Sequence, residues 1–234
     1  FEKAFYEEKH NFQVHFVGHP LIDEISARTP VVPENFRKEH QLDDRPIIAL
    51  LPGSRKQEIQ KMLEIMLSIT SDFPDYQFVI AGAPSQDLEF YEPFLKKNRV
   101  HIVMNQTYNL LDVAHAALVT SGTATLETAL FKVPEVVCYK GGRISYEIAK
   151  RVINLDYISL VNLIMDKEVV KELIQTEFNT KTLKKALTET LEEEKRKALF
   201  DEYYKLEQKL GGVGASANTA KLIVNAIQPT STPV

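Results

Sequence analysis

The sequence predicts an α/β fold in which a parallel sheet is covered by helices on both faces, with further helices at the C-terminal end. Short apolar runs rich in β-branched residues recur between residues 46 and 139, and segments with helical apolar spacing separate them. Strands that are apolar on both sides are typical of parallel sheets buried between two layers of helices. A chain of 234 residues is long enough to bury one substantial core.

The apolar runs place the expected strands and helices in order along the chain. Five strands are expected, at residues 46–51, 78–81, 100–103, 117–120 and 135–139. Helices are expected between and after them, at residues 57–69, 86–97, 110–116 and 124–131. Beyond residue 140 only helices are expected, including a polar stretch at 180–210 and a last helix at 218–227. The charge run at 192–197 is typical of a solvated helix face.

This order divides the chain into three expected parts. Residues 1–45, with an extended run at 14–17, form an N-terminal arm and interdomain linker. Residues 46–175 form the sheet domain, and residues 176–234 form a C-terminal helical extension. The chain begins without Met, inside an amphipathic pattern, which indicates a fragment of a longer protein.

Composition excludes several classes of protein. A net charge of −4 argues against a dedicated nucleic-acid binder. No apolar run reaches the length of a membrane span, and the N-terminus lacks a signal-peptide pattern. The single cysteine, Cys138, lies in an apolar run and is expected to be a core residue in a protein of the reducing cytosol.

Gly53-Ser54-Arg55 directly follows the first expected strand and precedes a helix. This position is the carboxyl edge of a parallel sheet, where open α/β folds bind ligands. Glycine permits close approach of a phosphate, the helix presents unpaired amides, and Arg55 can bond to phosphate oxygens. The alternative interpretation is a tight turn with a surface arginine.

The segment from Ser121 to Glu127 repeats this arrangement after the fourth expected strand. Its small residues, Ser121, Gly122, Thr123 and Ala124, leave room for a diphosphate, and Glu127 can accept hydrogen bonds from a ribose diol. The alternative is that Glu127 complements the helix dipole. A capping box would need Ser or Thr at position 124, where this chain has alanine.

Other patterns give no cofactor or metal site. The run from Gly212 to Ala217 matches G-x-G-x-x-G/A in letters, but it follows a polar helix and is interpreted as a helix stop and hinge. Walker and D-x-D motifs are absent, and His15 and His19 lie in an extended segment. We therefore expect no cofactor and no metal. Basic residues flank an expected amphipathic helix at 144–153, which either contacts anionic substrate or packs on the sheet; they are Lys140, Arg143, Lys150 and Arg151.

Five segments together resemble the lipid-A-disaccharide synthase family, in order and nearly from end to end. The resemblance implies a Rossmann-like UDP-sugar-binding domain, the C-terminal half of a GT-B-type glycosyltransferase. The resembling segments are 1–6, 16–20, 50–55, 121–127 and 156–163. The S-G-T-x-x-x-E pattern alone would indicate only UDP-sugar transferases and epimerases of similar architecture.

The resemblance also implies an activity and a set of site residues. Such enzymes transfer 2,3-diacylglucosamine from a UDP donor to 2,3-diacylglucosamine 1-phosphate, with inversion at the anomeric centre, at the cytoplasmic face of the inner membrane. It implies that Gly53, Ser54 and Arg55 hold phosphate, that residues 121–124 cradle the diphosphate, and that Glu127 binds ribose. Asn162 and Met104 are implied to line the nucleotide pocket. The alternative for Asn162 is that it satisfies the backbone of a loop.

The family's N-terminal half, which holds the acceptor surface, has no counterpart in this sequence. We therefore name no catalytic base, and expect the chain alone to bind UDP without catalysing transfer. A homodimer through the last helix is a further expectation. The rival functions are another UDP-N-acetylglucosamine transferase or 2-epimerase, and a non-catalytic nucleotide-binding module.

Overall fold

A computed structural model describes residues 2–98, 100–141 and 156–227. The chain divides into two compact units, one made of Phe1–Thr29 with Tyr204–Val234 and the other of Pro30–Tyr203. The boundaries expected after residues 45 and 175 differ from this division, because residues 30–45 and 176–203 belong to the same unit as the sheet. The expected helix at 144–153 lies outside the described residues.

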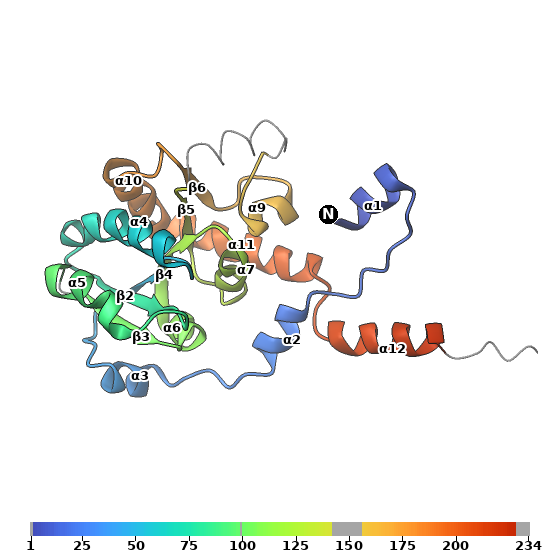
Figure 1. Ribbon diagram of the computed structural model, residues 1–234, viewed down its shortest axis with the longest axis horizontal. Helices are drawn as coiled ribbons and strands as arrows, with labels where there is room; N and C mark the ends of the chain where they lie inside the picture. The colour runs from blue at the N-terminus through green and yellow to red at the C-terminus, as the bar shows by residue number, and fades with distance from the viewer. Residues whose placement is uncertain (1, 99, 142–155, 228–234) are drawn as a thin grey trace, which may run out of the picture. The chain divides into compact units, whose positions relative to one another are not determined.

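The larger unit is built on a parallel sheet of six strands (Figure 1). The strand order is β3-β2-β1-β4-β5-β6, and every described pair is parallel. The order therefore reverses between β1 and β4, as in Rossmann-like folds. The strands are β1 (Ile47–Leu51), β2 (Gln77–Gly82), β3 (His101–Met104), β4 (Ala114–Thr120), β5 (Glu135–Tyr139) and β6 (Lys171–Ile174).

Five of these strands lie where the apolar runs predict them, although β4 begins three residues early, in the segment 114–116 that was expected to end a helix. The expectation that strands stop after residue 140 is wrong. Lys171–Ile174 pairs with β5 in parallel register as the edge strand β6. It escaped the pattern because it has only four residues, and two of them, Lys171 and Glu172, are charged. A short edge strand needs apolar side chains on one face only.

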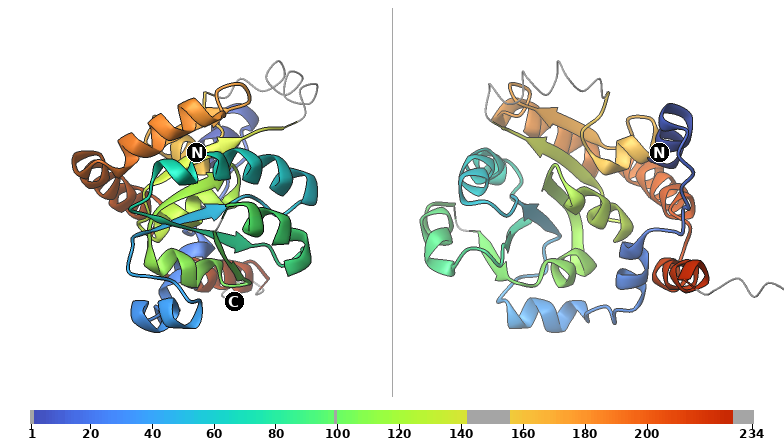
Figure 2. Two further views of the ribbon diagram at one scale, coloured as in Figure 1. Left: turned by 90° about the vertical axis from the view of Figure 1, so that its left-hand side faces the viewer. Right: turned by 45° about the vertical axis from the view of Figure 1, so that its right-hand side comes forward.

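Helices cover both faces of this sheet (Figure 2). Ile48 and Leu50 of β1 pack with α4 (Lys56–Met66), the 3₁₀ helix η1 (Leu67–Asp72), α5 (Leu88–Asn98) and α10 (Thr180–Leu191). The alternate β1 residues Ile47, Ala49 and Leu51 pack with α3 (Pro33–Glu39) and α6 (Thr107–Val113), and with part of α7 (Thr123–Leu130). Adjacent strand residues face opposite sides, so this alternation confirms the two-faced core that the apolar strands predict.

The polar stretch expected at 180–210 is two helices, α10 and α11 (Glu193–Lys209), which are separated at Glu192. The charge run is solvated only in part. Lys197 pairs with Glu193 one turn away at 2.7 Å, and both side chains are exposed. Arg196 instead donates to the backbone carbonyl of His115 at 2.6 Å, so it anchors α11 at the start of β4.

The smaller unit contains α1 (Glu2–His10), α2 (Pro20–Ser26) and α12 (Ala215–Ile227). The carboxylate of Asp23 joins α2 to the start of α12 by accepting from the backbone amides of Gly214 at 2.6 Å and Ser216 at 2.8 Å. These amides hold the pKa of Asp23 below its ordinary value. The run at 14–17 is irregular and forms no strand.

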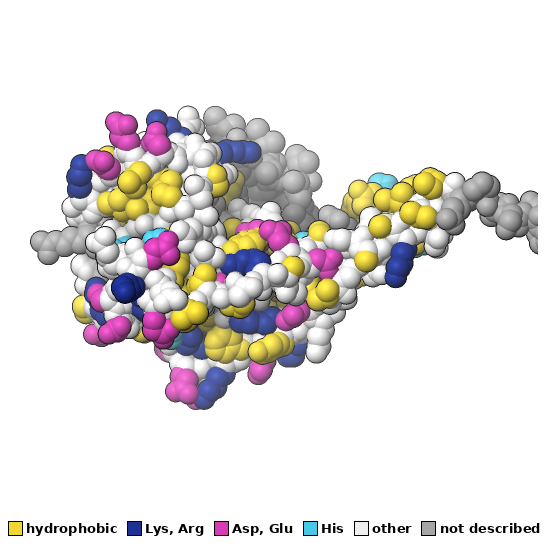
Figure 3. Space-filling view, turned by 90° about the horizontal axis from the view of Figure 1, so that it is seen from below, with side chains coloured by type: hydrophobic (Ala, Val, Ile, Leu, Met, Phe, Trp, Pro, Cys, Tyr) yellow, Lys and Arg dark blue, Asp and Glu magenta, His cyan; other side chains and the backbone are white. Residues whose placement is uncertain are grey.

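One helix of the smaller unit, α12, carries apolar side chains that remain exposed (Figure 3). They are Leu222, Ile223, Val224 and Ile227. The helix has 13 residues, and none of the described helices is long and apolar enough to cross a bilayer.

Candidate functional site

A cleft of about 330 Å³ opens at the carboxyl ends of β1 and β4, where the strand order reverses. Connections leave neighbouring strands in opposite directions at such a point, so a gap between them is available for a ligand. The loops after β1, β2 and β4 line the cleft together with the first turns of α4, α6 and α7. The lining residues are Leu51, Pro52, Gly53, Ser54, Glu58, Ala81, Ala83, Pro84, Thr107, Thr120, Ser121, Gly122, Thr123, Ala124 and Glu127.

The loop after β1 forms one wall of this cleft. Gly53 has a φ of +104°, a backbone conformation that side chains other than glycine's rarely adopt. A Cβ at this position would also collide with the carboxylate of Glu58, in the first turn of α4. The loop after β2 supports this wall, because the Ser85 hydroxyl donates to the Ser54 carbonyl at 2.5 Å. The backbone conformation thus requires glycine at position 53, the residue to which the sequence also assigns contact with phosphate.

The opposite wall is the turn from β4 into α7. Gly122 is the N-cap of α7 and has no side chain to bond to the first-turn amides. The open amides and the partial positive charge of a helix N-terminus are suited to an anion. Ser121 donates its hydroxyl proton to the Ile158 carbonyl at 3.0 Å, so its oxygen can accept a hydrogen bond from a ligand in this arrangement.

Glu127 projects from the second turn of α7 to the cleft, where it lies beside α6. The Tyr108 hydroxyl donates to Oε1 of Glu127 at 2.8 Å. The Tyr108 ring packs against Phe131, with 5.1 Å between ring centroids. A carboxylate with one oxygen held in this way still has lone pairs for a ligand diol.

Sequence reasoning missed Thr107, at the start of α6, and two further polar residues of the cleft. Thr120 ends β4, and its hydroxyl is buried without a hydrogen-bond partner among the described residues. Glu58 gives the cleft a second carboxylate beside Glu127, whereas no lysine or arginine is among the described lining residues. Neither residue was identifiable in advance, because Thr120 counted as a strand residue and Glu58 as part of an amphipathic helix.

Seven of the ten residues named from the sequence line the cleft, and Arg55, Met104 and Asn162 do not. Arg55 is the exposed N-cap residue of α4. Met104 ends β3 and packs against the core near Gly82. Asn162 is fully buried in α9 (Leu160–Met165).

Asn162 belongs to a buried polar network behind the cleft. Its Oδ1 accepts from the amides of Val169 at 2.8 Å and Val170 at 3.0 Å. Its Nδ2 donates to the Val170 carbonyl and to Oε1 of Glu172, both at 2.9 Å. The hydrogen bonds of Asn162 therefore agree with the alternative interpretation, in which its side chain satisfies the backbone of a loop.

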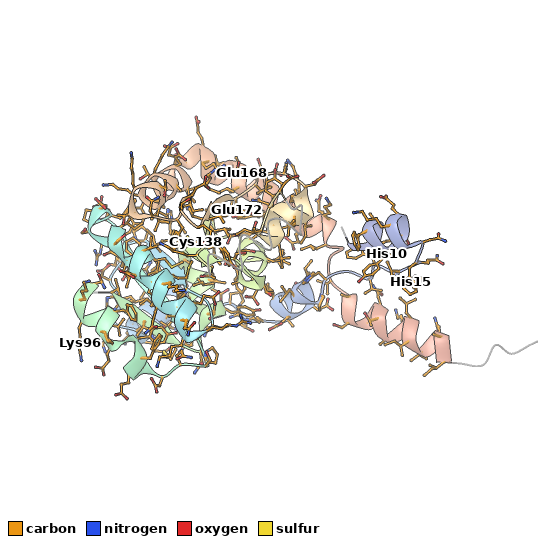
Figure 4. All side chains as sticks on the ribbon, turned by 45° about the horizontal axis from the view of Figure 1, so that its top comes forward. His10, His15, Lys96, Cys138, Glu168 and Glu172 are labelled. Carbon is orange, nitrogen blue, oxygen red and sulfur yellow. The ribbon has the colours of Figure 1, made fainter. Side chains whose placement is uncertain are left out.

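Glu172 connects this network to the cleft wall. It lies on β6 beside β5, which carries Cys138 (Figure 4). Its carboxylate accepts from the amides of Ile158 and Ser159, each at 2.9 Å. Ile158 is the residue whose carbonyl holds Ser121, so the network positions one side of the cleft.

Cys138 is free and fully buried, as predicted for a core residue. Burial, with a smaller contribution from the charge of Glu135, raises the pKa of the Cys138 thiol well above its ordinary value. A neutral buried thiol is a poor nucleophile. Cys138 therefore contributes to packing.

Solved structures of similar fold include a glycosyl transferase domain and a UDP-N-acetylglucosamine epimerase. The C-terminal domain of a glycosyl transferase group 1 family protein from Francisella tularensis matches 81% of this chain over 98% of its own length, with a TM-score of 0.53 and 14% identity. A UDP-N-acetylglucosamine 2-epimerase matches 97% of this chain over 56% of its own, with a TM-score of 0.54 and 16% identity. These likenesses show the fold of this chain, a Rossmann-like parallel sheet of the GT-B architecture.

The family model for lipid-A-disaccharide synthetase matches residues 1–226, and the chain belongs to this family. Lipid-A-disaccharide synthases from Coxiella burnetii and Syntrophus aciditrophicus are each 36% identical over 97% of this chain. One from Hahella chejuensis is 37% identical over 95%. The chain spans about 61% of the length of the first two and 59% of the third.

Proposed function

We propose that this chain is the donor-binding half of an enzyme that moves 2,3-diacylglucosamine from UDP to 2,3-diacylglucosamine 1-phosphate. The observation that carries the proposal is the cleft at the strand-order reversal, with an open helix N-terminus at Gly122 and a carboxylate at Glu127. The two substrates are part of the proposal and are inferred from membership of the family. The acyl chains of both substrates imply peripheral contact of the whole protein with the inner membrane at its cytoplasmic face.

The proposed chemistry breaks the bond between the anomeric carbon of the donor sugar and the oxygen of the β-phosphate. The acceptor's 6-hydroxyl attacks that carbon, and UDP leaves with increased negative charge. Amides at the start of α7 are fixed before the reaction, so they stabilise this charge without reorganising. The protein group that takes the acceptor's proton is assigned to no residue of this chain.

The proposal is tested by titrating UDP into the chain and following the heat of binding. We expect Glu127→Ala to weaken UDP affinity by about 10- to 100-fold, because hydrogen bonds to a charged group contribute about 1.5–3 kcal/mol. Glu89→Ala, at an exposed glutamate in the first turn of α5, is the matched control and should bind as the wild type does. Absence of UDP binding, or an unaffected Glu127→Ala variant, would overturn the assignment of the cleft.

A second titration tests the charge of the cleft. Glu58 places a carboxylate at the wall proposed for the diphosphate, and no lining lysine or arginine among the described residues offsets it. Glu58→Gln should therefore bind UDP about fivefold more tightly, since two charges a few ångströms apart in water repel by about 1 kcal/mol. The gain should shrink in high salt.

Glu64→Gln is the matched control for this charge effect, because it removes an exposed carboxylate farther along the same helix, α4. It should leave the affinity for UDP within about twofold of the wild-type value. If Glu58→Gln instead weakens binding, Glu58 contacts UDP as a hydrogen-bond acceptor and the repulsion argument is wrong.

A further inference from the structure

One contact at the cleft joins Glu127 to Tyr108, a residue that the sequence does not assign to the site. Glu127 is half-buried, and its Oε1 accepts the Tyr108 hydroxyl at 2.8 Å. Thr107, the residue before Tyr108, lines the cleft, and so does Glu127 itself. The hydroxyl of Tyr108 therefore bonds to a carboxylate at the edge of the proposed donor site.

The Tyr108 ring is held by its own packing. It lies against Phe131 at 5.1 Å between centroids, with 48° between the ring planes, and it joins the core on the α6 face of the sheet. A tyrosine side chain has only two rotatable bonds before the hydroxyl, so packing of the ring fixes the position of that hydroxyl. Tyr108 is thus a rigid donor.

Glu127 has no such rigidity of its own. The last torsion of a glutamate is broad, so an unheld carboxylate samples many orientations. The bond from Tyr108 selects one orientation, in which the described residues leave Oε1 one lone-pair direction and Oε2 both of its own. Two hydroxyls of a diol can then meet acceptors whose positions are already set, which lowers the entropy lost on binding.

We propose that Tyr108 is a positioning residue that orients the Glu127 carboxylate for the ribose diol of a uridine nucleotide. This inference rests on the proposed donor-binding function and adds a specificity element to the same cleft. It requires that the effect of Tyr108 on binding depend on both Glu127 and the ribose hydroxyls. A residue that merely joined α6 to α7 would show neither dependence.

The test compares UDP with 2′,3′-dideoxy-UDP as ligands of the wild type, Tyr108→Phe, Glu127→Ala and the double variant. Phenylalanine keeps the ring against Phe131 and removes only the donor. We expect Tyr108→Phe to weaken UDP about fivefold and to leave the affinity for the dideoxy nucleotide within about twofold. In the Glu127→Ala background, Tyr108→Phe should have no further effect on UDP, because coupled residues are not additive.

Tyr76→Phe is the matched control, since Tyr76 immediately precedes β2 at the amino edge of the sheet, away from the cleft. Equal losses for both nucleotides in Tyr108→Phe, or additive losses in the double variant, would overturn the positioning role. If Glu127→Ala abolishes the preference for UDP while Tyr108→Phe retains it, only this inference fails. If the wild type binds neither nucleotide, the proposed function fails with it.

Discussion

Asn162→Ala is expected to destabilise the larger unit by about 4 kcal/mol, the largest effect of any single substitution proposed for this chain. The side chain is fully buried and makes four hydrogen bonds. Alanine would leave the amides of Val169 and Val170 without an acceptor in the interior, and each unsatisfied buried group costs about 1–3 kcal/mol. It would also take one donor from the buried carboxylate of Glu172.

Urea denaturation followed by circular dichroism measures this loss. Asn98→Ala is the matched control, because the Asn98 amide bonds only to a carbonyl of its own helix among the described contacts, and its removal should cost about 1 kcal/mol or less. A native Asn162→Ala midpoint together with lost UDP binding would instead make Asn162 a ligand contact, as the family resemblance implies. A native midpoint with native UDP binding would contradict both roles.

The fold could be predicted largely because most of its strands are recognisable from their sequences. Strands β1, β2, β4 and β5 are buried on both faces, so their sequences are nearly continuous apolar runs. Half of the residues of β6 are charged, so a search for apolar runs does not detect it. The division of the chain into two units could not be predicted either. Asp23 bonds to Gly214 and Ser216, and such pairing between distant segments leaves no local pattern in the sequence.

The candidate site shows the same distinction between local and distant information. Gly53 and the turn from Ser121 to Ala124 were identifiable because small residues after a strand constrain the backbone locally. The Tyr108 contact with Glu127 joins residues 19 positions apart, and the Asn162 network joins α9 to β6. The partner of an isolated polar side chain depends on packing, so the sequence offered two roles for Asn162 and could not choose between them.

The second large effect concerns Glu135, a carboxylate at the start of β5 that is fully buried. Neither of its oxygens has a hydrogen-bond partner among the described residues. Burial, and secondarily the charge of Glu172, raises the pKa of Glu135 well above its ordinary value of 4.5. The folded state therefore keeps a proton at Glu135 that the unfolded chain releases above about pH 4.5.

The sign of the pH dependence follows from this proton. A raised carboxyl pKa contributes stability that is complete below the unfolded pKa and is lost as pH rises toward the folded pKa. While only the folded state holds the proton, the free energy of unfolding falls by about 1.4 kcal/mol per pH unit. Cys138 and Tyr203 add no slope between pH 5 and 8, because burial raises the pKa of each well above its ordinary value.

Glu135→Gln removes this dependence, because a neutral amide of nearly the same shape replaces the carboxyl group. As pH rises from 5 to 8, the variant should gain stability over the wild type, by up to about 1.4 kcal/mol for each pH unit over which only the folded wild type holds the proton. Urea midpoints at pH 5, 6.5 and 8 measure the difference, with Glu168→Gln at an exposed glutamate as the matched control (Figure 4). Parallel pH profiles for Glu135→Gln and the wild type would mean that Glu135 reaches water and titrates normally in the folded protein.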